Sequence, residues 1–185
     1  MKNRHVSLYL VLSALLVPNL IQAQTRVPVR AVAVMNITAE SLMGTWLASS
    51  ELTKPGVDMT TTGEKYFASN QKVEDRMTTS IVLKEHSPVP VVFAVQLESS
   101  WTLSREGRFL CETLSKFSVS LISKPDDNVL PGFLVRQMMD QMQSGLKSQV
   151  VAGKANCKQV EMSSKRTFAL KDGQSGLITQ FKRVK

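Results

Sequence analysis

Hydrophobic and polar residues alternate most regularly over residues 89–103. The odd positions carry Val89, Val91, Phe93, Val95, Leu97, Trp101 and Leu103, with Ser99 as the polar exception. From Gln96 onward the even positions are polar. An apolar face with a period of two suits a β-strand, because a helix cannot present it on one side. The pattern therefore predicts a long strand over 89–103 with one buried face.

A second alternating stretch, residues 109–121, is the expected hairpin partner, with Arg105-Glu106-Gly107 between the two. A two-residue turn would pair Trp101 with Glu112 and Ser99 with Leu114, which mixes polar and apolar faces. A three-residue loop with Gly107 in the left-handed conformation gives the pairs Leu103–Phe109, Trp101–Cys111, Val95–Phe117 and Phe93–Val119. We predict the second register, because it pairs residues of similar polarity and because three-residue loops favour a glycine at their last position. It places the Trp101 indole beside Cys111 on the buried face.

Shorter patterns predict further strands on both sides of this hairpin. They cover residues 27–34, 46–52, 65–69, 73–84, 158–162, 167–171 and 177–183. Pro55-Gly56, Gly63 and Asn70 are the turn residues expected between the early ones. Eight or nine strands at near-regular spacing predict a mainly all-β fold, either an antiparallel barrel or a sandwich.

Two helices are expected to interrupt the strands. Residues 133–150 place Val135, Met138, Met139, Met142 and Leu146 on one stripe, which predicts an amphipathic helix that Gly153 can end. A shorter helix is expected over residues 38–44. There Thr38 is the predicted N-cap, and Ser41 takes the place of the usual capping-box Glu.

Two short motifs are shared with a known family. Gly44-Thr45-Trp46 follows the short helix, and Ser99-Ser100-Trp101-Thr102-Leu103 enters the hairpin. In these features the chain resembles the lipocalin-like (calycin) β-barrels over residues 41–185. The resemblance implies an antiparallel meander that closes into a barrel. It also implies that Trp46 packs across the closed end beneath a basic residue of the last strand, Arg183 or Lys182. The helix at 133–150 departs from the family, whose main helix usually follows the last barrel strand.

The first 23 residues have the pattern of a secretory signal peptide. Lys2, Arg4 and His5 precede an apolar stretch over residues 6–17, and Ala23 is a small residue at the expected cleavage position. No cysteine lies at that position, so a lipoprotein anchor is not expected. Beyond residue 25 no apolar run is long enough to span a membrane. We therefore expect a periplasmic or secreted protein without a stable membrane anchor, with residues 24–185 folding as a single domain.

Composition adds little to this picture. The chain has 185 residues, of which 43% are hydrophobic and 21% charged, as in an ordinary globular domain. Removing the signal peptide lowers the formal net charge from +8 to +6. The basic residues are dispersed, which favours a solvated surface over a nucleic-acid site. Cys111 and Cys157 are the only cysteines, and in an oxidising compartment they predict one structural disulfide.

Candidate catalytic residues are few. His86 lies in a turn-like Glu85-His86-Ser87-Pro88 stretch, where an exposed loop residue is expected. Asp126 and Asp127 precede the predicted helix and suit capping and solubility better than a cation site. Glu98 and Glu112 are a conceivable carboxylate pair, but nothing in the sequence places them in a pocket. We therefore expect no enzyme activity, no cofactor and no metal.

Two non-enzymatic functions remain. In the first, a small apolar or amphipathic ligand binds inside the barrel. Its walls would be Phe93, Val95, Trp101, Phe117 and Val119, with Met138, Met139 and Met142 of the helix as a lid. The same residues also suit an ordinary packed core. In the second, the protein is an accessory module that binds a protein or envelope partner through the exposed helix face or the strand at 27–34.

Overall fold

The fold is known from a computed structural model that describes residues 37–184, apart from the side chains of Met162 and Ser163. The predicted signal peptide and the predicted strand at 27–34 lie outside the described residues. Within the described residues eight strands are present: β1 (Gly44–Lys54), β2 (Val57–Phe67), β3 (Lys72–Leu83), β4 (Val91–Leu103), β5 (Phe109–Ser123), β6 (Asn156–Ser164), β7 (Thr167–Lys171) and β8 (Ile178–Arg183). In the same part of the chain, two helices, α2 (Ala39–Leu42) and α3 (Gly132–Ala152), accompany them.

The strands form a closed antiparallel barrel. Each strand pairs with the next along the chain, and β8 returns to pair with β1. The helix α3 is inserted between β5 and β6, and α2 precedes β1. The predicted all-β fold with one inserted helix and a short N-terminal helix is thereby confirmed.

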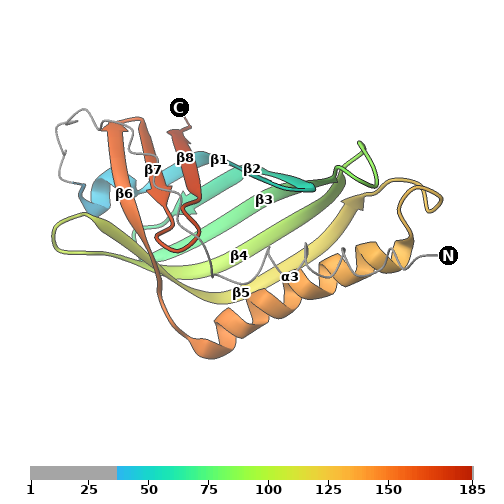
Figure 1. The fold of residues 1–185 in the computed structure, drawn as a ribbon. Coiled ribbons are helices and arrows are strands. Elements are labelled where there is room, and N and C mark those ends of the chain that lie inside the picture. Colours follow the sequence, from blue (N-terminus) through green and yellow to red (C-terminus); the bar gives the residue numbers. More distant parts are fainter. Residues whose placement is uncertain (1–36, 185) are drawn as a thin grey trace.

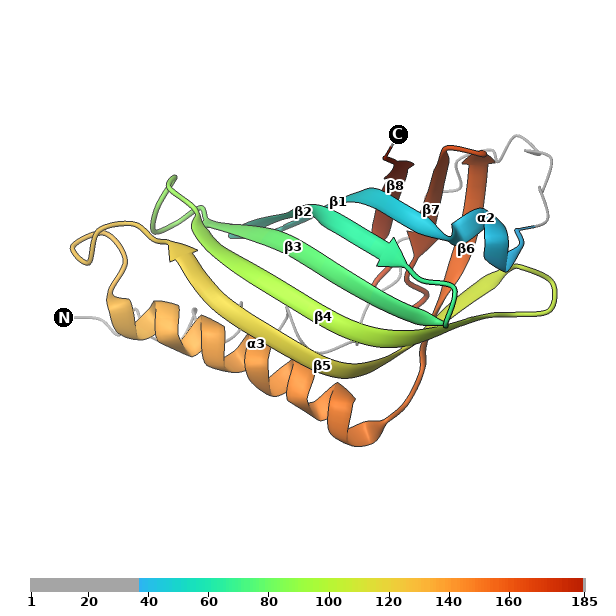
Figure 2. The same cartoon turned by 180° about the vertical axis from the view of Figure 1, so that it is seen from behind.

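Closure is confined to one end of the barrel. β8 pairs with β1 only over Trp46–Ser49, and β6 pairs with β5 only over Phe109–Glu112. Beyond these pairs β1 to β5 continue as a long curved sheet, past the short strands β6 to β8 (Figures 1 and 2). We refer to the two parts as the closed end and the open end. At the open end α3 runs alongside β5 (Figure 1).

Each end has its own apolar core. The closed-end core is aromatic: its largest members are Trp46, Phe67, Trp101, Phe168 and Phe181. The open-end core is aliphatic apart from Phe93 and joins the sheet to α3; it comprises Val57, Ile81, Leu83, Val91, Phe93, Leu130, Val135 and Met138. The two cores are thus packed independently.

Arg183 covers the closed end, as the resemblance to lipocalin-like barrels implies. Its guanidinium carbon lies 4.4 Å from the ring centroid of Trp46, and its Nη1 donates to the carbonyl of Met43 at 3.0 Å. The Trp46 indole donates to the carbonyl of Leu42 at 2.7 Å. These contacts tie α2 and the last strand to the same tryptophan.

Both predicted helices are present, but α2 is shorter than the predicted 38–44 and α3 extends beyond 133–150 at both ends. Thr38 is the N-cap of α2, and the side chain of Ser41 bonds back to the Thr38 N–H, completing the capping box. The helix α3 ends at Gly153. α3 has 21 residues. Within residues 37–184 no helix combines the length and the apolarity that crossing a membrane requires.

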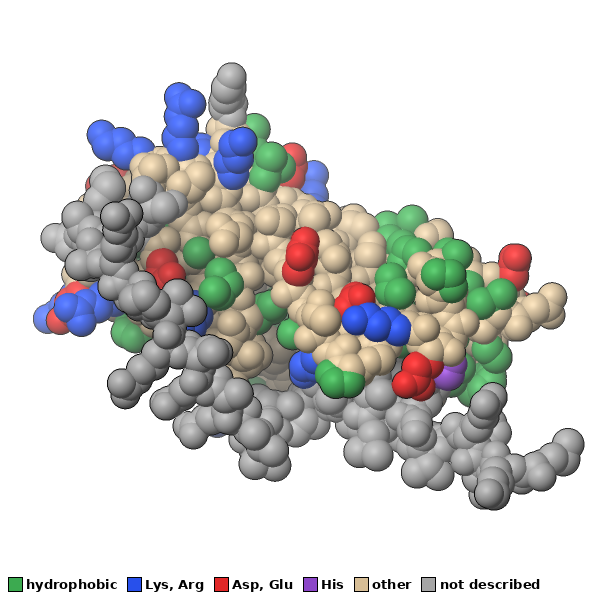
Figure 3. All heavy atoms as spheres, turned by 45° about the horizontal axis from the view of Figure 1, so that its top comes forward, with side chains coloured by type: hydrophobic (Ala, Val, Ile, Leu, Met, Phe, Trp, Pro, Cys, Tyr) green, Lys and Arg blue, Asp and Glu red, His purple; other side chains and the backbone are tan. Residues whose placement is uncertain are grey.

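Several large apolar side chains are exposed at the outer tip of the open end. They come from the β3–β4 loop, the end of β5, the following loop and the start of α3: Val89, Leu121, Ile122, Val129 and Phe133. Figure 3 shows hydrophobic side chains gathered at this end, whereas basic side chains project from the end that carries β6 to β8. We call the first group the apolar tip.

The predicted register of the long hairpin is wrong. Near the turn, Trp101 lies opposite Glu112 and Ser99 opposite Leu114, the alternative that we rejected. A bulge then adds Ser115 to β5, so that Val95 pairs with Val119 and Phe93 with Leu121. Gly107 does adopt a left-handed conformation, with φ of 66°.

The disulfide between Cys111 and Cys157 is confirmed, but its place differs from the prediction. The two cysteines face each other across β5 and β6, with an S–S distance of 2.02 Å. Cys111 lies opposite Thr102, while Trp101 points into the closed-end core. The disulfide therefore joins β5 to β6 within their short ladder.

Gly63 is not a turn residue, because β2 begins at Val57 and continues past Gly63 without interruption. A Cβ on Gly63 would lie 2.1 Å from the carbonyl oxygen of Arg76 and 2.7 Å from the Cα of Met77. A glycine within a strand marks such a close approach of two backbones. Gly63 is therefore required where β2 and β3 bend together.

Replacing Gly63 with alanine should destabilise the barrel by about 1–3 kcal/mol, because two backbones must separate to admit the methyl group. Urea unfolding followed by circular dichroism would measure the loss. Gly173→Ala is the matched control, since a Cβ there meets nothing within 4 Å and the residue does not have a positive φ. Equal stabilities of the two variants would contradict this interpretation of the bend.

Candidate functional site

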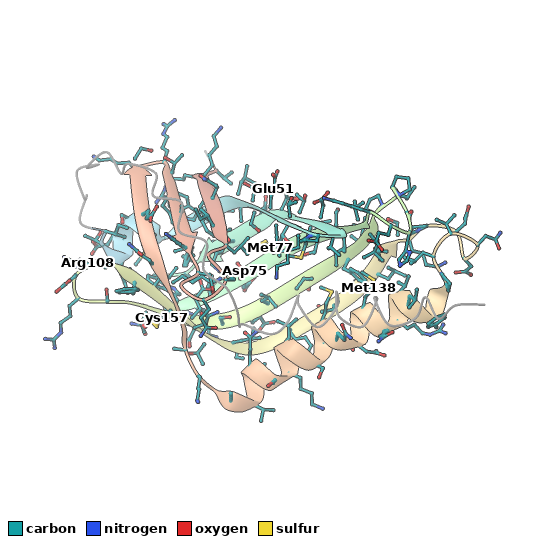
Figure 4. The ribbon with its side chains drawn as sticks, in the orientation of Figure 1. Glu51, Asp75, Met77, Arg108, Met138 and Cys157 are labelled. Carbon is teal, nitrogen blue, oxygen red and sulfur yellow. A yellow bond between two sulfur atoms is a disulfide. The ribbon has the colours of Figure 1, made fainter. Side chains whose placement is uncertain are left out.

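A cavity of about 240 Å³ lies between α3 and the inner face of the sheet at the open end. Its lining is mostly apolar and comes from four elements: Met59 and Thr61 of β2, Thr79 and Ile81 of β3, Val95 of β4, and Met138, Gln141, Met142, Gly145, Leu146 and Gln149 of α3. Figure 4 shows Met138 pointing from the helix toward the sheet. We call this space the helix cavity.

The sequence pattern explains the lining. On β2 and β3 the lining residues are two positions apart, so they share the inner face. On α3 they recur at three- and four-residue spacing, which is one side of a helix. The two threonines bond to each other, with 3.2 Å between their hydroxyl oxygens, so their hydroxyl groups add little unpaired polarity to the wall.

The predicted ligand-binding residues lie in several parts of the barrel. Val95, Met138 and Met142 line the helix cavity. Phe93, fully buried, and Val119 belong to or pack on the open-end core, and Trp101 belongs to the closed-end core. Phe117 is half-buried on β5, opposite Leu97. The structure therefore does not bring the predicted residues to one wall.

A second hollow of about 200 Å³ lies on the other side of α3, toward the end of β5. Its lining includes Leu121, Val135 and Met139, together with the Lys124–Asp127 ion pair and Arg136. Met139 therefore faces this hollow, although it shares the predicted helix stripe with Met138 and Met142.

A cluster of buried charges lies on the inner face toward the closed end, and the sequence analysis missed it. The Lys65 ammonium is 2.9 Å from Asp75 Oδ2 and 2.8 Å from Glu112 Oε1. The side chains of Lys65 and Asp75 are each only 5% exposed, and that of Glu112 is 16% exposed. We call Lys65, Asp75 and Glu112 the charged cluster.

The attraction between opposite charges in the cluster offsets the free-energy cost of burying them. Burial by itself disfavours the Lys65 ammonium, but the carboxylates of Glu112 and Asp75 outweigh it and raise the pKa of Lys65. Burial also raises the pKa of Asp75, since the attraction of Lys65 only partly compensates. Lys65 is therefore a firmly charged centre, whereas burial opposes the ionisation of Asp75.

Two buried polar atoms near this cluster have neither a hydrogen-bond partner nor an ion-pair partner among the described residues. They are Asp75 Oδ1 and the indole Nε1 of Trp101. Trp101 lies opposite Glu112, and its ring meets that of Phe67 edge to face at 5.5 Å. The Lys65 ammonium is 5.5 Å from the centroid of the same Phe67 ring. The two unpaired atoms thus belong to one polar region beneath the aromatic core.

The remaining candidate residues lie at the surface. His86, Asp126 and Glu98 are exposed, and Glu98 pairs with Lys116 on the outer face. Glu112 instead faces inward, so these two glutamates do not share a site. Over residues 37–184 no group of three or more His, Cys, Asp or Glu side chains is placed to hold a metal ion.

Replacing Lys65 with methionine should lower the free energy of unfolding by about 3–5 kcal/mol, because two buried carboxylates lose their counter-charge. Urea unfolding at neutral pH would measure the change. Lys116→Met is the control: it removes an exposed pair with Glu98 and should leave stability almost unchanged. A Lys65→Met protein as stable as this control would show that the cluster does not depend on its cation.

Comparison with known proteins finds no protein-family model and no curated protein that matches this chain. The function proposed below therefore rests on the fold, the helix cavity and the charged cluster.

Proposed function

We propose that this protein is a periplasmic or secreted binding protein, without enzyme activity, that holds a small apolar or amphipathic ligand in its barrel. The observation that carries the proposal is the helix cavity, an apolar space between α3 and the inner face of the sheet. Ligand sites of this kind are concave, mostly apolar and marked by a few polar groups.

The chemistry of the wall supports this function. Met59, Met138 and Met142 supply flexible thioethers that adapt to differently shaped ligands. The volume of about 240 Å³ lies just below the 300–1,000 Å³ usual for ligand pockets, so a slender ligand fits best. Gln141 and Gln149 on α3 are polar groups at the same cavity.

The family resemblance points in the same direction. A Gly-x-Trp motif at the start of β1, an arginine of the last strand over that tryptophan and a closed antiparallel barrel are all present. We propose that the chain is a divergent lipocalin-like protein. Its helix lies between β5 and β6 rather than after β8, where it covers the open end.

A second candidate function is supported by the apolar tip. Phe133 and Ile122 are each 56% exposed, and three more large apolar side chains accompany them. Exposed apolar patches commonly mark contact surfaces. On this alternative the protein is an accessory module that binds an envelope partner there and carries no small ligand.

The proposed location rests on the signal-peptide pattern and on the disulfide. Residues 1–23 have the charged start, apolar stretch and small cleavage residue of an exported protein. Disulfides such as Cys111–Cys157 persist mainly in oxidising compartments.

The helix cavity should bind the fluorescent apolar probe N-phenyl-1-naphthylamine. Leu146→Trp fills the cavity and should weaken binding by at least about tenfold, which is about 1.4 kcal/mol. Ser144→Trp adds the same side chain at an exposed position of the same helix and should leave the affinity unchanged. If the wild-type protein does not bind the probe, the ligand-binding function is wrong and the accessory module is favoured.

The exported protein should begin at Gln24 and contain no free thiol. Intact mass measurement of the protein from the periplasm or medium should give residues 24–185 less two hydrogens for the disulfide. The mass should increase on alkylation only after reduction. A chain that keeps Met1, or cysteines that alkylate without reduction, would contradict the proposed location.

A further inference from the structure

We propose that the charged cluster recognises the polar end of the ligand, and that this ligand is an amphiphile whose head group donates hydrogen bonds and carries no negative charge. This inference rests on the proposed function, because the apolar part of the same molecule must occupy the helix cavity. It names the class of ligand, which the cavity alone does not.

The helix cavity and the charged cluster share two strands. Thr79 lines the cavity, and Asp75 lies four residues earlier on the same face of β3, a distance of about 13 Å along a strand. Thr61 and Lys65 have the same relation on β2. Figure 4 shows Asp75, Met77 and Met138 in this order from the closed end toward the helix. An extended ligand can therefore reach from one site to the other.

The stretch between the two sites is incompletely filled. Inward-facing residues in the middle of β2, β3, β4 and β5 are only half-buried, unlike the core residues on either side: Gly63, Met77, Leu97 and Phe117. Gly63 has no side chain, and Met77 opposite it is flexible. Space therefore remains along the inner face for a chain that passes Phe117, one of the predicted ligand contacts.

The charges of the cluster exclude an anionic head group. Lys65 contacts both Asp75 and Glu112, so its one positive charge faces two carboxylates. Lys158 also attracts Asp75 but forms no ion pair with it. A ligand carboxylate or phosphate would therefore bring a third acceptor group to the one ammonium that contacts the cluster. A hydroxyl or an ammonium group instead supplies donors.

The two unpaired atoms specify the expected head group of the ligand more closely. Asp75 Oδ1 can accept a hydrogen bond, and Trp101 Nε1 can donate one. A ligand hydroxyl can pair with either atom, because it both donates and accepts, whereas an ammonium group can pair only with Asp75. Buried polar atoms are normally paired, so a head group that pairs with one of them is favoured over one that leaves both unpaired.

The test compares three amphiphiles with the same tail: dodecan-1-ol, dodecylamine and dodecanoate. Each competes with N-phenyl-1-naphthylamine for the purified protein, at concentrations below micelle formation. We expect the alcohol and the amine to displace the probe at concentrations at least about tenfold lower than dodecanoate, the ratio that one hydrogen bond to a charged group supplies. The relative order of alcohol and amine then distinguishes a hydroxyl ligand from a cationic one.

Three variants separate the contributions of the cluster. Asp75→Asn should weaken the amine and strengthen dodecanoate, because the site loses a negative charge. Trp101→Phe should weaken the alcohol more than the amine, because only the alcohol accepts from the indole. Glu74→Gln, on the outer face beside Asp75, is the control and should change neither. If Asp75→Asn fails to fold, Glu112→Gln removes the same charge from another strand.

The outcomes distinguish the two proposals. If the three amphiphiles displace the probe equally, or dodecanoate is the strongest, the head-group inference is overturned while the helix cavity remains a ligand site. If the probe binds and the preference survives both Asp75→Asn and Glu112→Gln, the cluster does not select the ligand. If the wild-type protein binds neither probe nor amphiphile, the proposed function itself fails, and this inference fails with it.

Discussion

The unequal length of the strands is the constraint on which the rest of this structure depends. β4 and β5 have 13 and 15 residues, whereas β7 and β8 have five and six. Strands so different in length can close a barrel only where all of them are present, which is the end that holds Trp46 and Phe168. Beyond this end, the short strands β6 to β8 no longer face the inner side of β1 to β5. The helix α3, placed in the chain just before the short strands, covers that face.

This division also accounts for the two separate cores. Aromatic side chains fill the narrow closed end, where Phe168 stacks on Phe181 with ring centroids 4.4 Å apart and meets Trp46 edge to face. Aliphatic and thioether side chains meet α3 at the open end. The charged cluster lies on the inner face where the aromatic core stops.

Much of the fold follows from local patterns in the sequence. Alternation predicts the long hairpin, the stripe of Met138 and Met142 predicts α3, and the paired cysteines predict the disulfide. The hairpin register could not be predicted, because the bulge at Ser115 shifts β5 by one residue and has no clear local signal. Before the bulge the even-numbered residues Leu110, Glu112 and Leu114 face inward, whereas after it the odd-numbered residues Phe117 and Val119 do. A single alternation of inward and outward residues therefore does not describe the whole strand.

The charged cluster was hidden for a different reason, since its members come from three strands and Lys65 and Glu112 are 47 positions apart. The alternation of residues along β2 and β3 did contain a signal. Asp75 lies between Val73 and Met77 on an apolar face, and Lys65 lies two residues before the inward-facing Phe67. Opposite charges at apolar positions of neighbouring strands indicate a buried pair. Such a pair adds little stability compared with apolar side chains of similar volume. Stability alone therefore does not explain one cation held by two buried carboxylates, and the head-group recognition proposed above would give the cluster a role.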